Sequence, residues 1–528
     1  MEVSISPALD LMSTSRKLAL ESNSSPLQEA ALTPVNPANT GPTTSPLTNV
    51  PSAIVEINRP FEPPATYQEP TTVSTYVRET GYKGAAATAT SQAMISSLNQ
   101  IAEKKTKFSI SSLFSQIGAL SRETSEYKNE VRQFQVPAKV AAEKFTPEFG
   151  SNKGSPLESA YLTVKTKDGD TVKIQLSRLA QGIDNYGLEF SFVVDGKLSE
   201  QEQKALGALA EKLGAMGDEF FRADTTELRG LKDIDTDVIS HFSFTMERPD
   251  PKTNSYVKHS YEFNFDEVAQ TQSLSAVDVE GYAVDISMQL QPLVKGNNAD
   301  SYVLQQYIDL INSAGEDGKS PNASKRFMLD TFESMFSGFL AVASEQLDKN
   351  ADRAEMALMA FDSGLPDFNA KFSSPVYHNP GNYKQAESMI LTLEQRTSVE
   401  RSGENLLVKQ ESSYDFSNSY FEGYPGEMLE HLGGSYTYIT EHKTGSVSRM
   451  LSMTNDVVNN IWIQQDASKE VNKTHYQNYQ LVDNESYSYS DRRMQEFSEL
   501  LKKYNDNKQR SAVEELLKSS KEQLFLKI

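Results

Sequence analysis

The chain has 528 residues, with 72 Asp and Glu against 51 Lys and Arg, so its formal net charge at pH 7 is −21. Such a charge repels phosphate backbones and anionic lipid surfaces, which makes nucleic acid and membranes poor default partners. The complete lack of cysteine excludes disulfides, zinc–thiolate sites, iron–sulfur clusters and a cysteine nucleophile. The length is that of two or three domains.

The N-terminal 90 residues are rich in Pro, Ser, Thr, Ala and Asn, and apolar residues are sparse among them. This composition predicts a disordered arm over 1–90, acting as a tether or as an export or docking segment. No apolar signal-peptide core follows Arg16 and Lys17, and no stretch is long and apolar enough to span a bilayer. We therefore expect a cytoplasmic protein without membrane insertion. The missing cysteines leave secretion by a leaderless route as the alternative.

A helical segment is predicted over 91–150. Its first apolar stripe consists of Met94, Leu98 and Ile101. A second stripe is interrupted at Thr124 and ends before Pro137, and it consists of Ile110, Leu113, Ile117, Leu120, Tyr127, Val131 and Phe134.

An α+β module is predicted over 151–295. It opens with a hairpin, YLTVKTKDGDTVKIQL, in which a three-residue loop, Asp168–Asp170, would place the apolar rows of both strands on one face. This loop would pair Val164 with Ile174 and Leu162 with Leu176. The strand-like pieces HFSFTMER, HSYEFNFD and GYAVDISMQL are expected to complete an antiparallel sheet.

The clearest helix of the sequence lies in the middle of this module. Ser199 and Glu202 form a capping box at its start. Its narrow, coiled-coil-like apolar seam consists of Leu206, Leu209, Leu213, Met216 and Phe220. Gly207 and Gly214 lie on one side of the helix, each at a cost of roughly 1 kcal/mol in helix propensity, which predicts close approach of a neighbouring backbone.

The rest of the chain divides into three predicted segments. Residues 296–396 are read as helical, with a buried stripe that favours core packing over a groove for a partner helix; it consists of Met328, Phe332, Met335, Phe339 and Val342. Residues 397–490 are read as a Tyr-rich antiparallel β region with one wet face. Residues 491–528 are read as C-terminal helices, with a capping box at Ser511 and Glu514 and a terminal LFLKI that docks on the fold.

The aromatic residues of the β region have two interpretations. Tyr436 shares a face with Tyr438, Tyr487 shares one with Tyr489, and Trp462 points opposite to the isoleucines on either side of it. Exposed Tyr rows form contact surfaces at low entropic cost, but a structural role is favoured here.

Four apparent chemical signals do not meet the requirements of their motifs. Gly315–Ser320 (GEDGKS) resembles a phosphate-binding loop, but Ser313 replaces the first glycine and a helix precedes it. The cluster of Asp233, Asp235 and Asp237 matches the first calcium-loop ligands, but the later glycine and glutamate positions are Val238 and Phe244. A solvated acidic turn is favoured over weak cation binding.

The remaining signals concern histidine and serine. No G-x-S-x-G elbow is present, and no pair of histidines has zincin spacing; the histidines are His241, His259, His378, His431, His442 and His475. The sequence therefore predicts no catalytic, cofactor-binding or metal-binding residue, and no cofactor.

The run from Leu198 to Phe244 resembles an uncharacterised proteobacterial family, a domain of unknown function. The resemblance is carried by the capped helix ending in Asp218-Glu219-Phe220-Phe221, the acid-rich turn and the strand His241–Phe244. It extends loosely over 155–290, about a quarter of the chain. It implies a bacterial origin and an α+β module, and it transfers no activity and no site residues.

The expected fold class is α+β, with antiparallel sheets, packed amphipathic helices and a disordered N-terminal arm. The expected function is that of a non-enzymatic bacterial interaction or structural protein, with a protein as its partner. A hydrolase that uses an unrecognised carboxylate constellation is the alternative.

Overall fold

The computed structural model describes part of the compact unit Glu69–Ile528. The described residues are 71–102, 108–137, 156–180, 186–222, 235, 237–249, 258–290, 301–337, 358, 361–379, 381–423, 435–455, 457–478, 480–497 and 524–526. Residues 1–70 of the predicted arm lie outside this part, as do Asp233, His431, Ser511 and Glu514.

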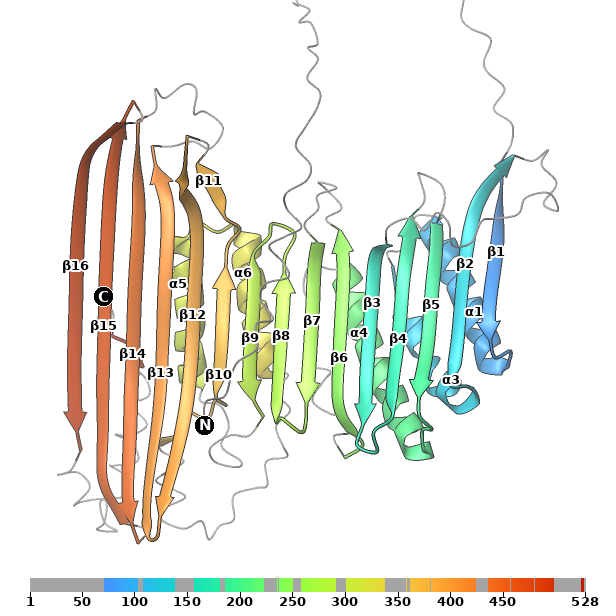
Figure 1. Ribbon diagram of the computed structural model, residues 1–528, viewed down its shortest axis with the longest axis horizontal. Coiled ribbons are helices and arrows are strands. Elements are labelled where there is room, and N and C mark those ends of the chain that lie inside the picture. Colours follow the sequence, from blue (N-terminus) through green and yellow to red (C-terminus); the bar gives the residue numbers. More distant parts are fainter. Residues whose placement is uncertain are drawn as a thin grey trace, which may run out of the picture. The chain divides into compact units, whose positions relative to one another are not determined.

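A single 16-stranded antiparallel sheet organises the described residues (Figure 1). Its order is β1-β2-β5-β4-β3-β6-β7-β8-β9-β10-β12-β13-β14-β15-β16, and the short β11 pairs with β12. The strands are β1 (Thr71–Gly81), β2 (Glu126–Pro137), β3 (Pro156–Thr166), β4 (Thr171–Ala180), β5 (Tyr186–Asp195), β6 (Ile239–Pro249), β7 (Lys258–Asp266), β8 (Thr271–Val277), β9 (Ala283–Gln289), β10 (Phe368–Ser373), β11 (Tyr377–Asn379), β12 (Asn382–Ser402), β13 (Asn405–Glu422), β14 (Tyr436–Thr454), β15 (Val457–Gln477) and β16 (Gln480–Glu496).

The helices lie on one side of this sheet (Figure 1). They are α1 (Ala85–Ala102), α2 (Ser111–Phe114), α3 (Ile117–Glu123), α4 (Glu200–Arg222), α5 (Ser301–Asp317) and α6 (Asn322–Ser337). The α+β fold class is therefore wrong, because the chain builds one large, mainly β structure in which helices cover one face, not separate sheets among packed helices.

Strict alternation along the strands explains how one sheet separates two environments. In β6, Phe242 and Phe244 are fully buried under the helices, whereas Ser243 and Thr245 point to the opposite side and are half-buried. Since successive side chains of a strand point to opposite faces, each strand contributes one apolar and one polar row. We call the helix-bearing side the inner face and the polar side the open face.

The helix α4 confirms the predictions made for it. Ser199 and Glu202 form the capping box, in which the Ser199 amide donates to Glu202 Oε2 at 2.7 Å and the Glu202 amide donates to Ser199 Oγ at 3.3 Å. All five residues of the predicted seam are buried.

The two glycines of α4 provide close backbone approach, as predicted. A Cβ at Gly207 would lie 3.1 Å from the Cα of Gly118 in α3, and a Cβ at Gly214 would lie 3.0 Å from the Cα of Ser111 in α2. The absence of side chains lets α2 and α3 lie directly on α4.

The Asp-Glu-Phe-Phe run at the end of α4 has a structural explanation. Asp218 Oδ1 accepts the backbone amides of Ile110 at 2.6 Å and Ser111 at 3.1 Å, and its Oδ2 accepts both the Ser109 and the Ser111 hydroxyl. One carboxylate thereby satisfies the donors at the start of α2. Phe220 and Phe221 are buried and meet edge to face, with ring centroids 5.0 Å apart.

The β3–β4 hairpin has the predicted buried face but a different register. Val164 pairs with Val172 and Leu162 with Ile174, each two positions from the predicted partner, so the turn is centred on Asp168 instead of Gly169. The Thr166 amide donates to the Asp170 carbonyl across this loop at 2.9 Å. A shift of two residues preserves the face of every side chain, which is why alternation alone could not detect it.

Four stretches that were predicted as helix or as disordered arm contain strands. Residues 126–137, read as helix, form β2; 368–396, read as helical, contain β10, β11 and most of β12; and 491–496 belong to β16, not to a C-terminal helix. Residues 71–90, assigned to the arm, contain β1 and the start of α1. In β2, Tyr127 and Val131 are four residues apart, a spacing that fits one face of a strand as well as one face of a helix.

The C-terminal residues dock as predicted. Leu524, Phe525 and Leu526 are buried on the inner face. The Phe525 ring lies 5.7 Å from that of Tyr307 in α5 and 5.2 Å from that of Tyr414 in β13.

Candidate functional site

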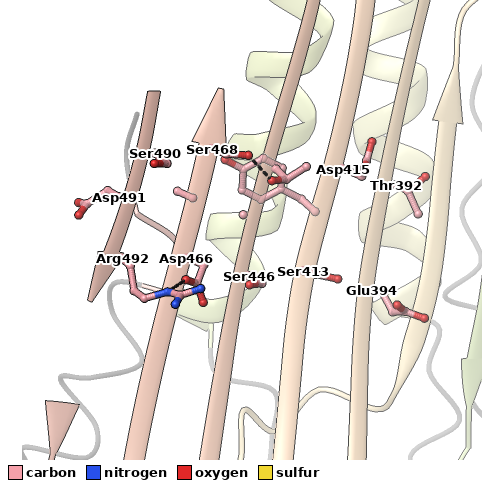
Figure 2. A pocket seen from close by; sticks show the side chains of 14 residues that line it. Thr392, Glu394, Ser413, Asp415, Ser446, Asp466, Ser468, Ser490, Asp491 and Arg492 are labelled. Atoms are coloured by element: carbon pink, nitrogen blue, oxygen red, sulfur yellow. Dashed lines mark hydrogen bonds and ion pairs between the residues drawn. The ribbon is translucent and has the colours of Figure 1, made fainter. Parts of the chain in front are cut away.

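The open face of the long strands β12 to β16 carries a hollow of about 700 Å³ (Figure 2). Two rows of polar side chains cross the strands and border it. One row consists of Glu394, Ser413, Ser446, Asp466 and Arg492, and the other of Thr392, Asp415, Thr444, Ser468 and Ser490. We call these ten residues the polar hollow.

Register places these residues side by side although they come from five strands. In β13, Ser413 and Asp415 point to the open face while the intervening Tyr414 points inward and is buried. Ser413 is directly opposite Glu394 on one side and Ser446 on the other. A polar residue at every second position of each strand is therefore sufficient to assemble the rows.

The floor of the hollow is thin where the inner residues are small. Gly445 and Ala467 lie between the two rows. A Cβ on Gly445 would lie 2.2 Å from the ring of Tyr414, so only glycine leaves space for this ring on the inner face. Polar side chains therefore form the two borders of the hollow, and the backbone between them forms its bottom.

The carboxylates of the polar hollow are partnered. Asp466 forms an ion pair with Arg492 and accepts a hydrogen bond from Gln464 Nε2 at 2.5 Å. The Gln464 hydrogen bond, assisted by Arg492 and opposed by partial burial, lowers the pKa of Asp466. Asp466 is therefore ionised at neutral pH.

The other two carboxylates have neighbours along or across the strands. Glu394 lies 2.5 Å from Arg396 Nη2, and Asp415 Oδ2 lies 3.1 Å from His442 Nε2. Two of the hydroxyls also bond to each other, because Thr444 Oγ1 lies 2.7 Å from Ser468 Oγ. The hollow is a hydrogen-bonding surface with a negative formal charge, since it combines three carboxylates with one arginine.

A second hollow, of about 290 Å³, continues the same face toward the other end of the strands. Its open-face lining includes Ser417, Ser419, Thr440 and Glu470. The hydroxyl-rich surface is therefore longer than the polar hollow alone.

A cavity of about 640 Å³ lies on the inner face between α5, β12 to β14 and the C-terminal residues. Its basic group, Lys443, lies 2.7 Å from Asp317 and 3.2 Å from Glu441. Burial lowers the pKa of Lys443, but Asp317 and Glu441 outweigh this effect and raise it above its usual value. This lysine is thus held charged and paired, unlike a nucleophilic amine, which requires a lowered pKa.

A hydrolase that uses two carboxylates requires one of them to be protonated near neutral pH. In the described part of the chain, burial raises the pKa of one carboxyl, that of Asp278, although hydrogen bonds from Ser324 and from the amides of Tyr282 and Glu280 oppose the shift. Asp278 accepts those amides at 2.8 and 2.9 Å and closes the turn between β8 and β9. Its surroundings are those of a turn residue.

The structure also shows the contacts of residues from the motifs that were rejected in the sequence. Lys319, in the loop-like GEDGKS run, follows α5 and lies 4.2 Å from the ring centroid of Tyr420. Two residues of the acidic turn, Asp235 and Asp237, are described. The Asp237 amide donates a hydrogen bond to Asp235 Oδ1 at 3.2 Å. Among the described residues no group of His, Asp and Glu is arranged to hold a metal ion.

The predicted tyrosine pairs divide into two kinds. Tyr436 is buried and stacks on Tyr476, with ring centroids 4.8 Å apart, and Phe421 lies between Tyr436 and Tyr438. This pair is structural. In contrast, Tyr487 and Tyr489 in β16 are each 54% exposed.

Trp462 lies between two buried isoleucines and points to the open face, as predicted. The polar hollow itself was missed in the sequence. Its signal was present as Ser, Thr and Asp at alternate positions, but alternation does not show which strands are neighbours.

Comparison with models of protein families, with curated proteins and with solved structures finds no match for this chain. The resemblance of 155–290 to a proteobacterial family stays a prediction. In the part of the chain that the structure describes, no helix is long and apolar enough to cross a bilayer.

Proposed function

We propose that the chain is a non-enzymatic interaction protein that binds a protein partner on the open face of β12 to β16. The observation that carries the proposal is the polar hollow, in which five strands present hydroxyls and carboxylates along one accessible surface. A sheet face that only needed to be soluble would require no such hollow.

The surroundings of the carboxyl groups support binding over hydrolysis. The acids of the polar hollow lie beside arginine, histidine or amide side chains, and the carboxyl with a raised pKa, Asp278, closes the turn between β8 and β9, outside the hollow. Paired acids with opposed pKa values in one pocket are the mark of acid–base catalysis, and this arrangement lacks that mark among the described residues.

The chemistry of the hollow selects the kind of partner. Glu394, Asp415 and Asp466 outnumber Arg492, and the whole chain carries a charge of −21. A partner surface with Lys or Arg side chains and further hydrogen-bond donors would complement both the carboxylates and the hydroxyls. Electrostatic attraction would also make association faster at low salt than at high salt.

The test compares two serine substitutions on the same face. Ser446→Arg places a bulky cation at the centre of the hollow, whereas Ser273→Arg makes the same change on β8, away from it. Both serines are half-buried open-face residues. Partners captured from native cells by the full chain should be lost with Ser446→Arg and retained with Ser273→Arg.

Two results would contradict the proposal. One is an identical set of captured proteins with both variants. The other is hydrolysis of a substrate by the purified chain that is abolished by Glu394→Gln or Asp415→Asn, since this would assign the same surface to catalysis.

A further inference from the structure

The strand β16 forms one edge of the sheet and is long for an edge strand. It runs for 17 residues and pairs with β15, while no described strand pairs with its outer side. Such an edge presents a row of unpaired backbone amides and carbonyls, which is a template for another strand.

Several of the usual protections of an exposed edge are absent from β16, although it carries charged side chains. Natural edge strands are protected by shortness, bulges, proline or charged residues, lysine above all. The sequence of β16, QLVDNESYSYSDRRMQE, contains neither proline nor lysine, and its register with β15 is regular from Asp483 to Glu496. The opposite edge, β1, has only 11 residues.

We propose that β16 pairs antiparallel with β16 of a second copy of this chain, so that the two sheets become one. The charge distribution of the strand carries this inference. Its first half carries two acids, Asp483 and Glu485, whereas its second half carries both arginines and is neutral as a whole; the charged residues of the second half are Asp491, Arg492, Arg493 and Glu496. Antiparallel pairing of two copies places the acidic half of each strand opposite the half of the other that carries both arginines.

The side chains favour one register, with the twofold axis at Tyr489. Glu485 then lies opposite Arg493 of the second copy, and Tyr487 lies opposite Asp491, in each case twice per dimer. With the axis at Ser488, Glu485 would instead lie opposite Asp491, and like charges placed directly opposite destabilise a strand pair. The axis at Tyr489 avoids that repulsion and places the two Tyr489 side chains against each other.

The inner-face side of β16 has room for this contact. Tyr487 and Tyr489 point to this side and are each 54% exposed, so pairing would bury aromatic surface that the single chain leaves in water. In this register each odd-numbered residue lies opposite an odd-numbered residue of the second copy, so paired side chains point to the same face of the joined sheet. The twofold axis is therefore perpendicular to the sheet. The open faces of both copies are therefore on the same side, although the pairing itself does not depend on what the open face binds.

A disulfide test is specific because the chain has no cysteine of its own. Tyr489→Cys places one thiol at the proposed axis, where opposed Cα atoms of an antiparallel pair lie about 4.5–5.5 Å apart, within the range that a disulfide spans. Under mild oxidation this variant should form a covalent dimer. The matched control, Ser398→Cys on the exposed part of β12, should stay monomeric in a denaturing gel.

Charge reversal tests the same pairing without a covalent bond. Analytical ultracentrifugation of the full chain should show a dimer. Glu485→Lys and Arg493→Glu should each weaken dimerisation by about tenfold or more, since two opposite-charge pairs become like-charge pairs. The double variant restores the attraction and should dimerise like the wild type. Glu400→Lys, the same charge change at an exposed site on β12, should leave the dimer intact.

Several results would overturn the inference. A wild-type chain that is monomeric at all accessible concentrations would refute it, as would dimerisation unaffected by both single reversals. Open-ended polymers would indicate β16-to-β1 pairing instead of a closed dimer. A disulfide formed by Ser488→Cys but not by Tyr489→Cys would overturn the register.

Discussion

The contact between α2 and α4 makes Gly214→Ala a test with two opposing energies. Alanine should stabilise the helix by roughly 1 kcal/mol in propensity. The new Cβ would lie 3.0 Å from both the Cα of Ser111 and the Cβ of Phe114, atoms that cannot rotate away. Overpacking of a rigid core costs about 1–3 kcal/mol, so we expect a net loss of about 1 kcal/mol.

Gly315→Ala in α5 is the matched control, because the neighbours of its new Cβ belong mainly to a flexible side chain. The nearest atoms are Cγ and Cδ of Lys325, at 2.7 and 2.9 Å, and that side chain can change rotamer. We expect this variant to be unchanged or up to about 1 kcal/mol more stable. The difference between the two variants isolates the cost of close approach.

Equilibrium urea unfolding followed by circular dichroism measures both variants. The midpoint should fall for Gly214→Ala and hold or rise for Gly315→Ala, with an unchanged slope. If Gly214→Ala is stabilised as much as Gly315→Ala, the glycine is not required by the packing of α2, and the explanation of the helix–helix contact is wrong.

Three further predictions concern stability. Phe525→Ala should lower the free energy of unfolding by about 3–5 kcal/mol, because it empties the contact with two aromatic rings; a loss under 1 kcal/mol in urea unfolding would show that the C-terminal residues are not docked. Asp218→Ala should destabilise more than Asp218→Asn, since only Asn retains an acceptor for the amides of α2, and equal melting temperatures would contradict this role. The pKa of Glu441 is lowered because Lys469 and Lys443 outweigh the opposing effect of burial, so its ionised form stabilises the fold above its unfolded-state pKa and this contribution is lost as pH falls through the lowered value. Glu441→Gln should therefore be less stable than the wild type at neutral pH, and the gap should close in strongly acidic buffer; a gap that widens on acidification would reverse the sign of the argument.

Features that depend on residues close together in the sequence were predicted correctly. The capping box at Ser199 depends on residues three positions apart, and the seam and glycines of α4 depend on one helical period. The alternation of Trp462 with its neighbours was likewise sufficient to assign their faces. In each case the deciding interaction is encoded within a few turns of helix or a few residues of strand.

Non-local pairing could not be predicted in the same way. The sheet is continuous because β9 pairs with β10, although the paired residues lie 80 to 90 positions apart in the sequence. Phe372 is opposite Val284 and Ala370 is opposite Ile286, and no local pattern specifies such partners. The strand β2 was mistaken for a helix because its apolar residues are spaced by four. The polar hollow depends on the same non-local order, since its rows exist only once five strands are aligned.

Carboxyl footprinting tests the central claim, that the open face of β12 to β16 binds a partner, most directly. The chain is labelled at its carboxylates with and without the proteins captured from native cells, and modification is quantified by mass spectrometry. We expect Glu394 and Asp415 to be protected and Asp285, an exposed acid on the open face over β9, to be labelled as before. Protection of Asp285 without protection of Glu394 and Asp415 would contradict the claim.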